Sequence, residues 1–382
     1  MEKSSREKRK HKMWMIAFVF LLGIIILGCI LLPPGSGRPK PFLDVAGKHL
    51  PGSISEKIHV DINGVSLGMF LMAKDERKPV VLFLGGGPGI PEYFLEHTYP
   101  TGLENEFVVC YLEYRGTSRS YNSDSSPETM TTVQYIDDVV AVTHYLQDRF
   151  GKDKIYLMGH SFGTYIGLKT ASQYPALYHA YIAMGQITDQ RRSEEIAYTY
   201  MKEQYQVLGN LKAVRDFEAY PILTSDEAYQ KYTISLLRDN SMHALGVGTM
   251  RNMKNVMNGI FFPSLRCAAY TPIERINIWR GKAFAQKTAV AVDRMRFNAF
   301  VEVPALGIPV FFLAGKYDYT CSYALQKEYY DQVQAPQKAF YTFENAAHSP
   351  LFEDPEKARA IFSQDILKGT ISLSDLISIA DP

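Results

Sequence analysis

Residues 154–173 read KIYLMGHSFGTYIGLKTASQ, and this stretch contains the motif that decides the fold. An apolar run typical of a buried strand comes first, and a pattern that favours a helix follows. Between them, Gly159 to Gly163 fit Gly-x-Ser-x-Gly with Ser161 at the centre. Small residues at both ends let neighbouring backbone pass close to a strained turn, which exposes the serine oxygen at the start of the helix. An ordinary serine in a glycine-rich turn is the alternative, but the flanking strand and helix favour Ser161 as a nucleophile.

Apolar segments on both sides of this unit predict a sheet whose strands alternate with helices. Strands are expected at residues 57–62, 65–72, 80–84, 107–112, 180–184, 309–314 and 338–343, and helices at 132–150, 322–333 and 355–367. Such alternation is typical of a doubly wound, mostly parallel sheet, so the sequence predicts an α/β fold. Asn63-Gly64 between the first two strands predicts a hairpin there.

The stretch at residues 189–301 breaks this alternation. It is polar, rich in Tyr, Met and Arg, and helical in pattern. We predict that it forms a helical cap, inserted between two strands of a core that residues 53–188 and 302–382 build together.

Two residues late in the chain complete a candidate catalytic set. A serine hydroxyl needs a base to take its proton, and the base needs an acid to orient it. Asp318 follows the strand at 309–314, and His348 follows the last strand, so the chain order is Ser, Asp, His. The alternatives are a turn or helix-capping role for Asp318 and a surface loop for His348. We predict Ser161, Asp318 and His348 as the catalytic residues.

A glycine-rich loop, Gly85 to Gly89, directly follows the strand at 80–84. Glycines let backbone N–H groups approach an oxyanion without a clash from a Cβ atom. We predict an oxyanion hole formed by the N–H groups of Gly86 and Phe162. A phosphate-binding P-loop is a weak alternative, because no Lys-Ser or Lys-Thr follows the glycines.

The N-terminal segment has the composition of a membrane anchor. Residues 1–12 carry six Lys and Arg against two Glu, and residues 13–32 carry no charge over a length that spans roughly 30 Å as a helix. This pattern predicts a cytoplasmic tail at 1–12, a transmembrane signal anchor at 13–32, a linker at 33–52 and an extracytoplasmic catalytic domain in a single-pass cell-membrane protein. A cleaved signal peptide, a lipoprotein modified at Cys29 and a buried core helix are the alternatives.

Charge and cysteine usage exclude several classes of partner. Lys and Arg number 41 and Asp and Glu 40, so no basic surplus favours nucleic acid as a partner. The four cysteines include no Cys-x-x-Cys pair, and no metal site is expected.

Three motifs together resemble the proline iminopeptidase branch of the α/β-hydrolase superfamily (peptidase family S33). They are the glycine-rich loop, the segment EYRGTSRS at 113–120 and the Gly-x-Ser-x-Gly motif, and the residues around Asp318 and His348 match the acid and base positions. Gly85 stands where the family has His, Glu113 where it usually has Asp, and Thr117-Ser118 replace a pair that contains Gly. The cap is similar only loosely.

The resemblance implies a cofactor-free serine hydrolase that cleaves a small peptide or ester substrate through an acyl-enzyme. Members of this branch release an N-terminal residue from peptides and bind its ammonium group through acidic residues of the cap. Glu194, Glu195 and Glu203 are the candidates for that role here. A carboxylesterase or lipase, and a non-catalytic surface protein with this fold, are the alternatives. Haloalkane dehalogenases and epoxide hydrolases are excluded, because they need Asp at the position of Ser161.

Overall fold

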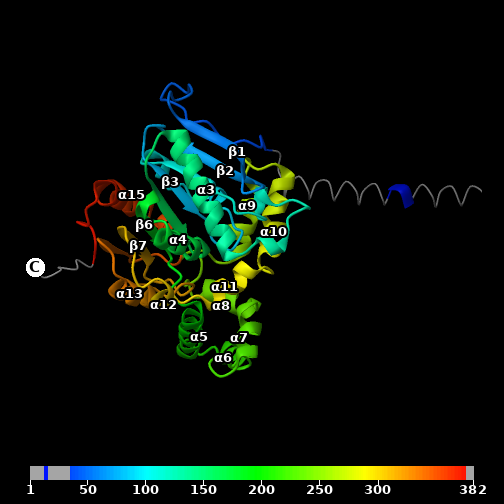
Figure 1. The fold of residues 1–382 in the computed structure, drawn as a ribbon. Helices are drawn as coiled ribbons and strands as arrows, with labels where there is room; N and C mark the ends of the chain where they lie inside the picture. Colours follow the sequence, from blue (N-terminus) through cyan, green and yellow to red (C-terminus); the bar gives the residue numbers. More distant parts are fainter. Residues whose placement is uncertain (1–12, 16–34, 376–382) are drawn as a thin grey trace, which may run out of the picture.

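The computed structural model describes residues 13–15 and 35–375. An eight-stranded sheet runs through it in the order β1-β2-β4-β3-β5-β6-β7-β8 (Figure 1). The strands are β1 Ile54–Ile62, β2 Val65–Ala73, β3 Val80–Leu84, β4 Val108–Leu112, β5 Ile155–His160, β6 Tyr178–Met184, β7 Val310–Gly315 and β8 Lys338–Phe343. All neighbours from β4 to β8 are parallel, whereas β1, β2 and β4 pair in antiparallel fashion. The predicted mostly parallel sheet is therefore present.

The turn between β1 and β2 fixes the register of the antiparallel edge. Asn63 and Gly64 both have positive φ, at 49° and 77°, so that Ile62 pairs directly with Val65. Positive φ at both central residues matches the twist of the two strands, and Asn-Gly adopts it at little cost.

Helices cover both faces of the sheet, as Figure 1 shows. The bounds of these helices are α2 Tyr93–Thr98, α3 Thr132–Phe150, α4 Phe162–Gln173, α13 Tyr323–Gln332, α14 Pro350–Glu353 and α15 Pro355–Gln364. Alternate residues of β3 belong to different apolar clusters: Leu82 packs on the side of α3 and α4, and Phe83 on the side of α2 and α15. Because both faces are buried, the strand is apolar at every position.

The cap is inserted between β6 and β7. It consists of α5 Gln190–Val207, α6 Leu211–Glu218, α7 Asp226–Thr233, α8 Leu236–Ala244, α9 Phe262–Arg266, α10 Pro272–Ala285, α11 Ala289–Arg296 and α12 Ala299–Glu302. Helices α5 to α8 form a separate lobe at the end of the sheet where the parallel strands end. An aromatic cluster around Tyr198, Phe217 and Tyr232 forms the small core of this lobe.

The prediction of a transmembrane anchor needs correction. No helix in residues 13–15 and 35–375 is long and apolar enough to cross a bilayer. Of the expected span at 13–32, only Met13 to Met15 are described, and three helical residues rise about 4.5 Å; the remainder, like the expected tail at 1–12, lies outside the described residues. The transmembrane helix, and the single-pass membrane location that rested on it, are therefore not supported. The described part of the expected linker contacts the cap, since the Gly37 N–H donates to the carbonyl of Ala268 at 3.0 Å.

Candidate active site

Ser161 lies on a sharp turn between β5 and α4. Its φ of 53° and ψ of −118° are strained for a residue with a side chain. A Cβ atom on Gly163 would lie 2.0 Å from the carbonyl oxygen of Leu84, and one on Gly159 would lie 2.6 Å from the carbonyl oxygen of Gly163. The two glycines of the motif are thus required by close backbone contacts, which hold the serine in its strained position.

Asp318 and His348 come together from the loops after β7 and β8. His348 Nδ1 lies 2.9 Å from Asp318 Oδ2, and both side chains are buried. The other carboxylate oxygen, Oδ1, accepts the N–H groups of Thr320 and Cys321, each at 2.9 Å. Gln326 Nε2 donates to Oδ2 at 3.0 Å. Three donors other than His348 therefore fix the carboxylate, which in turn fixes the orientation of the imidazole.

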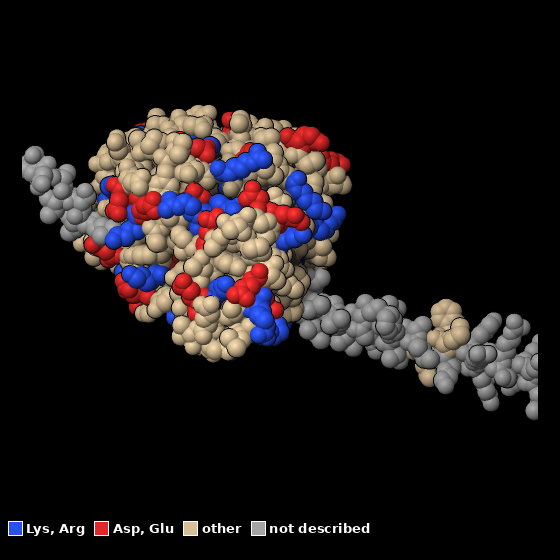
Figure 2. Space-filling model, turned by 90° about the horizontal axis from the view of Figure 1, so that it is seen from below, with Lys and Arg blue, Asp and Glu red and all other residues tan. Residues whose placement is uncertain are grey.

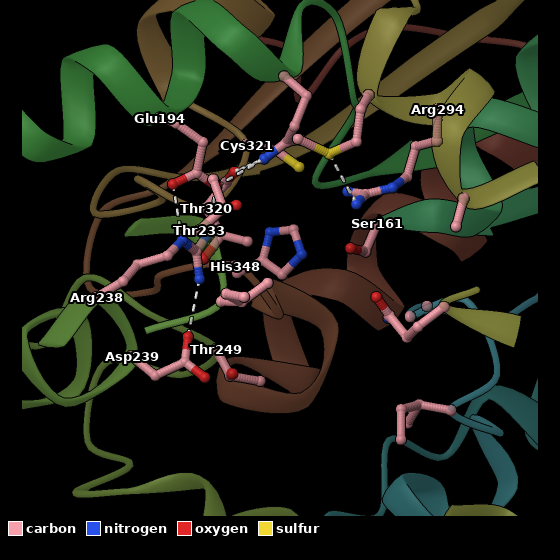
Figure 3. A pocket seen from close by; sticks show the side chains of 18 of the residues that line it. Ser161, Glu194, Thr233, Arg238, Asp239, Thr249, Arg294, Thr320, Cys321 and His348 are labelled. Carbon is pink, nitrogen blue, oxygen red and sulfur yellow. Dashed lines mark hydrogen bonds and ion pairs between the residues drawn. The ribbon is translucent and has the colours of Figure 1, made fainter. Parts of the chain in front are cut away.

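The second nitrogen of His348 faces the cavity that contains Ser161. His348 Nε2 is buried and has no hydrogen-bond partner among the described residues. Gly185, with φ of 61°, packs behind the ring; a Cβ there would lie 2.8 Å from the ring atoms. Figure 3 shows the imidazole beside the Ser161 side chain, and both line one cavity of about 930 Å³. The arrangement leaves Nε2 available to take a proton from the serine.

The glycine-rich loop lies against the turn that carries Ser161. A Cβ on Gly86 would lie 3.4 Å from the Ser161 Cβ. The Gly86 N–H itself donates to Glu92 Oε1 at 3.0 Å. In residues 35–375 no hydrogen bond is recorded from the N–H groups of Gly87 or Phe162. Of the two predicted oxyanion donors, the Phe162 N–H therefore has no acceptor among the described residues, whereas the Gly86 N–H already has one. The N–H of the neighbouring Gly87 also has no acceptor among these residues.

A buried acid–histidine pair next to Ser161 was not found from the sequence. Glu92 Oε1 lies 2.8 Å from His160 Nδ1, and His160 Nε2 lies 3.2 Å from the backbone carbonyl of His348. The pair thus connects the glycine-rich loop, the turn that carries Ser161 and the loop that carries His348. Burial lowers the pKa of His160, but the Glu92 carboxylate outweighs it, and the pKa is raised above its ordinary value. The available signal was an acid within the largely apolar run at 90–95.

We expect the Glu92→Gln variant to lose stability most strongly at low pH. A raised pKa of His160 means that the charged pair stabilises the fold fully below the ordinary value of 6.5, and that this contribution disappears as the pH rises through the raised pKa. The gap in thermal midpoint between wild type and Glu92→Gln, measured by calorimetry, should therefore narrow from pH 6 to pH 9. NMR titration should show a lower pKa for His160 in the variant, since burial then acts without the carboxylate. A gap that is constant with pH would contradict a charged pair.

The three acids proposed for the cap lie in different surroundings. Glu194 lines the cavity and is buried, but Arg238 donates to both of its carboxylate oxygens, at 2.7 Å from Nε and 2.5 Å from Nη2. Glu195 pairs with Arg191 at 2.6 Å. Glu195 and exposed Glu203 are not among the residues that line the cavity. The structure therefore brings Glu194 alone of the three to the site, and there it is already paired.

The cavity shows no arrangement suited to a metal. Among the described residues no group of three or more His, Cys, Asp or Glu side chains is placed to hold an ion. The chemical groups that converge near Ser161 are an imidazole, a carboxylate bonded to it and backbone N–H donors, which are the types of group that acyl transfer requires.

The family model of the α/β hydrolase fold matches residues 79–355, well over half of the chain. The protein is similar to the probable aminopeptidase YbaC of Bacillus subtilis (strain 168), with 29% identity over 307 residues that cover 79% of this chain and 93% of that protein. Among solved structures it resembles a proline iminopeptidase of Mycobacterium smegmatis, at a TM-score of 0.60 and 16% identity, over 82% of this chain and 98% of the other. A thermophilic esterase from Thermogutta terrifontis gives a TM-score of 0.52 at 15% identity, over 82% and 99% of the two chains. The chain is thus a hydrolase that belongs to the α/β-hydrolase fold family.

Proposed function

We propose that this hydrolase cleaves an acyl bond with Ser161 as nucleophile, His348 as base and Asp318 as the acid that orients the base. The observation that carries the proposal is the state of His348. Its Nδ1 is bonded to Asp318, while its Nε2 is buried, has no hydrogen-bond partner in residues 35–375 and faces the cavity of Ser161. A buried ring nitrogen without a partner costs free energy, and a role as proton acceptor explains its persistence.

The reaction proceeds in two halves. His348 Nε2 removes the proton of the Ser161 hydroxyl as its oxygen attacks the acyl carbon, and the imidazolium then gives this proton to the leaving group as the acyl bond breaks. A water molecule, deprotonated by the same nitrogen, attacks the acyl-enzyme and releases the acid and the free serine. Asp318 keeps the imidazole in the tautomer with hydrogen on Nδ1 throughout.

Backbone N–H groups stabilise the oxyanion of both tetrahedral intermediates. The Phe162 N–H, at the first turn of α4, is unoccupied and carries the positive end of the helix dipole. The Gly86 N–H of the glycine-rich loop is bonded to Glu92, so it can serve as the second donor only if that bond opens. The unoccupied Gly87 N–H is the second donor that needs no such change.

The substrate class is an aminoacyl compound or an ester. Aminopeptidase activity is supported by the name of the Bacillus relative and by the proline iminopeptidase motifs. One observation favours an ester that lacks an ammonium group: the carboxylate of Glu194, which would bind such a group, is neutralised by Arg238. Initial rates on prolyl, alanyl and acyl-ester chromogenic substrates, measured side by side, separate the two.

A fluorophosphonate probe tests the catalytic assignment directly. We expect covalent labelling of the native protein at the peptide that contains Ser161, identified by mass spectrometry, because only an activated serine reacts at a useful rate. Heat-denatured protein is the control and should remain unlabelled. Labelling of another serine, or none at all, would remove Ser161 from the role of nucleophile.

A further inference from the structure

The charged side chains that line the cavity are unevenly paired. Its acids each have a basic partner within salt-bridge distance: Glu92 has His160, Glu194 has Arg238, Asp226 has Arg191 and Asp239 has Arg238. Three basic residues of the lining, Arg294, Lys282 and Arg296, form no salt bridge within the described part of the chain. Arg238 serves two of these acids, so the lining carries five Lys and Arg against four Asp and Glu, and the charged groups without a salt-bridge partner among the described residues are all positive.

Arg294, on α11, is the unpaired base whose surroundings point most directly to a ligand. Its Nε is buried without a hydrogen-bond partner in residues 35–375, and its Nη2 donates only to the sulfur of Met295, a weak acceptor, at 3.0 Å. In Figure 3 the guanidinium extends toward the side chains of Ser161 and His348. All three residues line the same cavity.

Arg238 has a carboxylate partner, Glu194, whereas Arg294 has none among the described residues. Burial lowers the pKa of Arg238, but the Glu194 carboxylate outweighs it and raises the pKa well above the ordinary value. For Arg294 burial dominates and the pKa is lowered. Burial likewise lowers the pKa of Lys282, whose Cα lies 3.1 Å from the position of a Cβ on Gly89 in the glycine-rich loop. A partly buried guanidinium that remains charged without an anion costs free energy, which a bound anion would recover.

The positive excess belongs to the cavity rather than to the molecule as a whole. The chain carries 41 Lys and Arg against 40 Asp and Glu. On the face seen in Figure 2, which includes the cap, side chains of both signs are interspersed. General attraction of anions to a basic surface therefore does not account for the unpaired bases inside.

We propose that the substrate of this hydrolase carries a carboxylate, bound by the Arg294 guanidinium close to the scissile acyl group, with Lys282 as a second positive charge. A guanidinium donates two parallel hydrogen bonds to a carboxylate, a geometry that fits a single monoanionic group. This inference rests on the proposed acyl-enzyme mechanism and narrows its substrate class to anionic acyl compounds. The reaction remains hydrolysis, in which water supplies a hydroxyl to the acyl group and a proton to the leaving group.

Two pairs of esters, matched in size and different in charge, test the proposal. The mono-para-nitrophenyl esters of glutaric acid and of glutaric acid monoamide differ in charge on the acyl side. The acetyl esters of para-hydroxybenzoate and para-hydroxybenzamide place it on the leaving group. In at least one pair we expect a kcat/KM about tenfold or more higher for the anionic member, the scale of one charge-assisted hydrogen bond pair.

Variants then assign the preference to one side chain. Arg294→Gln should abolish the preference, because it should lower kcat/KM about tenfold more for the anionic than for the neutral member of a pair, whereas Arg294→Lys should retain part of it. Arg192→Gln is the matched control, because Arg192 pairs with Glu328 outside the cavity. Equal kcat/KM within both pairs for the wild type, or an equal loss on neutral and anionic esters in Arg294→Gln, would overturn the proposal.

A binding measurement keeps the test independent of turnover. Glutarate should raise the thermal midpoint of the wild type and compete with a neutral ester, and glutaramide should do neither; the effect of glutarate should be lost in Arg294→Gln. Absence of Ser161-dependent turnover of these four esters and of the prolyl and alanyl substrates would refute the proposed mechanism alone. Turnover without charge preference, or glutarate that binds no better than glutaramide, would refute the carboxylate site alone.

Discussion

Replacement of Ser161 by Ala should reduce kcat on the best ester or aminoacyl substrate by about 10³ to 10⁶, the range of nucleophile knock-outs in serine hydrolases. The change removes only the hydroxyl oxygen and keeps the Cβ, so the strained backbone at φ of 53° and the contacts of the two flanking glycines are not altered. The thermal midpoint should therefore change little while turnover is lost. Initial rates under saturating substrate, together with calorimetry, measure both quantities.

Ser172→Ala is the matched control for this experiment. Ser172 lies on the same helix, α4, and is not among the residues that line the cavity. Its replacement should leave kcat within about twofold of wild type, as for a surface change away from special features. Full turnover by Ser161→Ala would mean that another group performs the attack and would end the assignment.

Local signals in the sequence were sufficient for the elements that form the core. The motif around Ser161 combines a buried strand, two glycines and a helix within twenty consecutive residues, and the structure places β5 and α4 there. The Asn63-Gly64 turn likewise depends on the conformations of two adjacent residues. Elements whose conformation depends on residues adjacent in the sequence can therefore be predicted from the sequence alone.

Contacts between distant segments could not be predicted in the same way. Arg238 meets Glu194 across 44 positions of the cap, and His160 meets Glu92 across 68 positions. No residue near Glu194 in the sequence indicates that it is paired, and the sequence alone therefore predicts a free carboxylate that could bind a substrate ammonium group. The packing of α5 against α8 instead brings Arg238 to this carboxylate. The unpaired state of Arg294 is equally invisible until all its neighbours are placed.

The N-terminal anchor shows the limit of composition as evidence. The prediction depends on an uncharged run that is long enough to span a bilayer as a helix. Length and composition show that such a helix could span a membrane, but not that it forms. Within residues 13–15 and 35–375 no helix meets the length and hydropathy that spanning requires, and the described chain was instead accounted for by a sheet, its helices and a cap.

Asp318→Asn should lower kcat by about 10⁴, the loss known when the triad acid of a serine protease is made neutral. The hydrogen-bond partners of the Asp318 carboxylate do not suit the amide group of the introduced Asn in either orientation. With its oxygen toward the N–H groups of Thr320 and Cys321, the new NH₂ group faces His348 Nδ1, which then must accept. The imidazole hydrogen moves to Nε2, where it blocks removal of the serine proton.

The reverse orientation of the amide is also unfavourable, and this makes the expected loss large. A flipped NH₂ group would oppose two backbone N–H donors, whose positions the chain after β7 fixes. In the first orientation, Gln326 cannot turn its own amide to accept from the new NH₂ group, because its Oε1 accepts the Gln186 N–H and its Nε2 also donates to the carbonyl of Cys321. Glu344→Gln, an exposed acid in the loop that leads to His348, is the control and should remain within about twofold of wild-type kcat. If Asp318→Asn kept its rate within tenfold while it remained folded by calorimetry, the tautomer of His348 would not be under the control of this carboxylate.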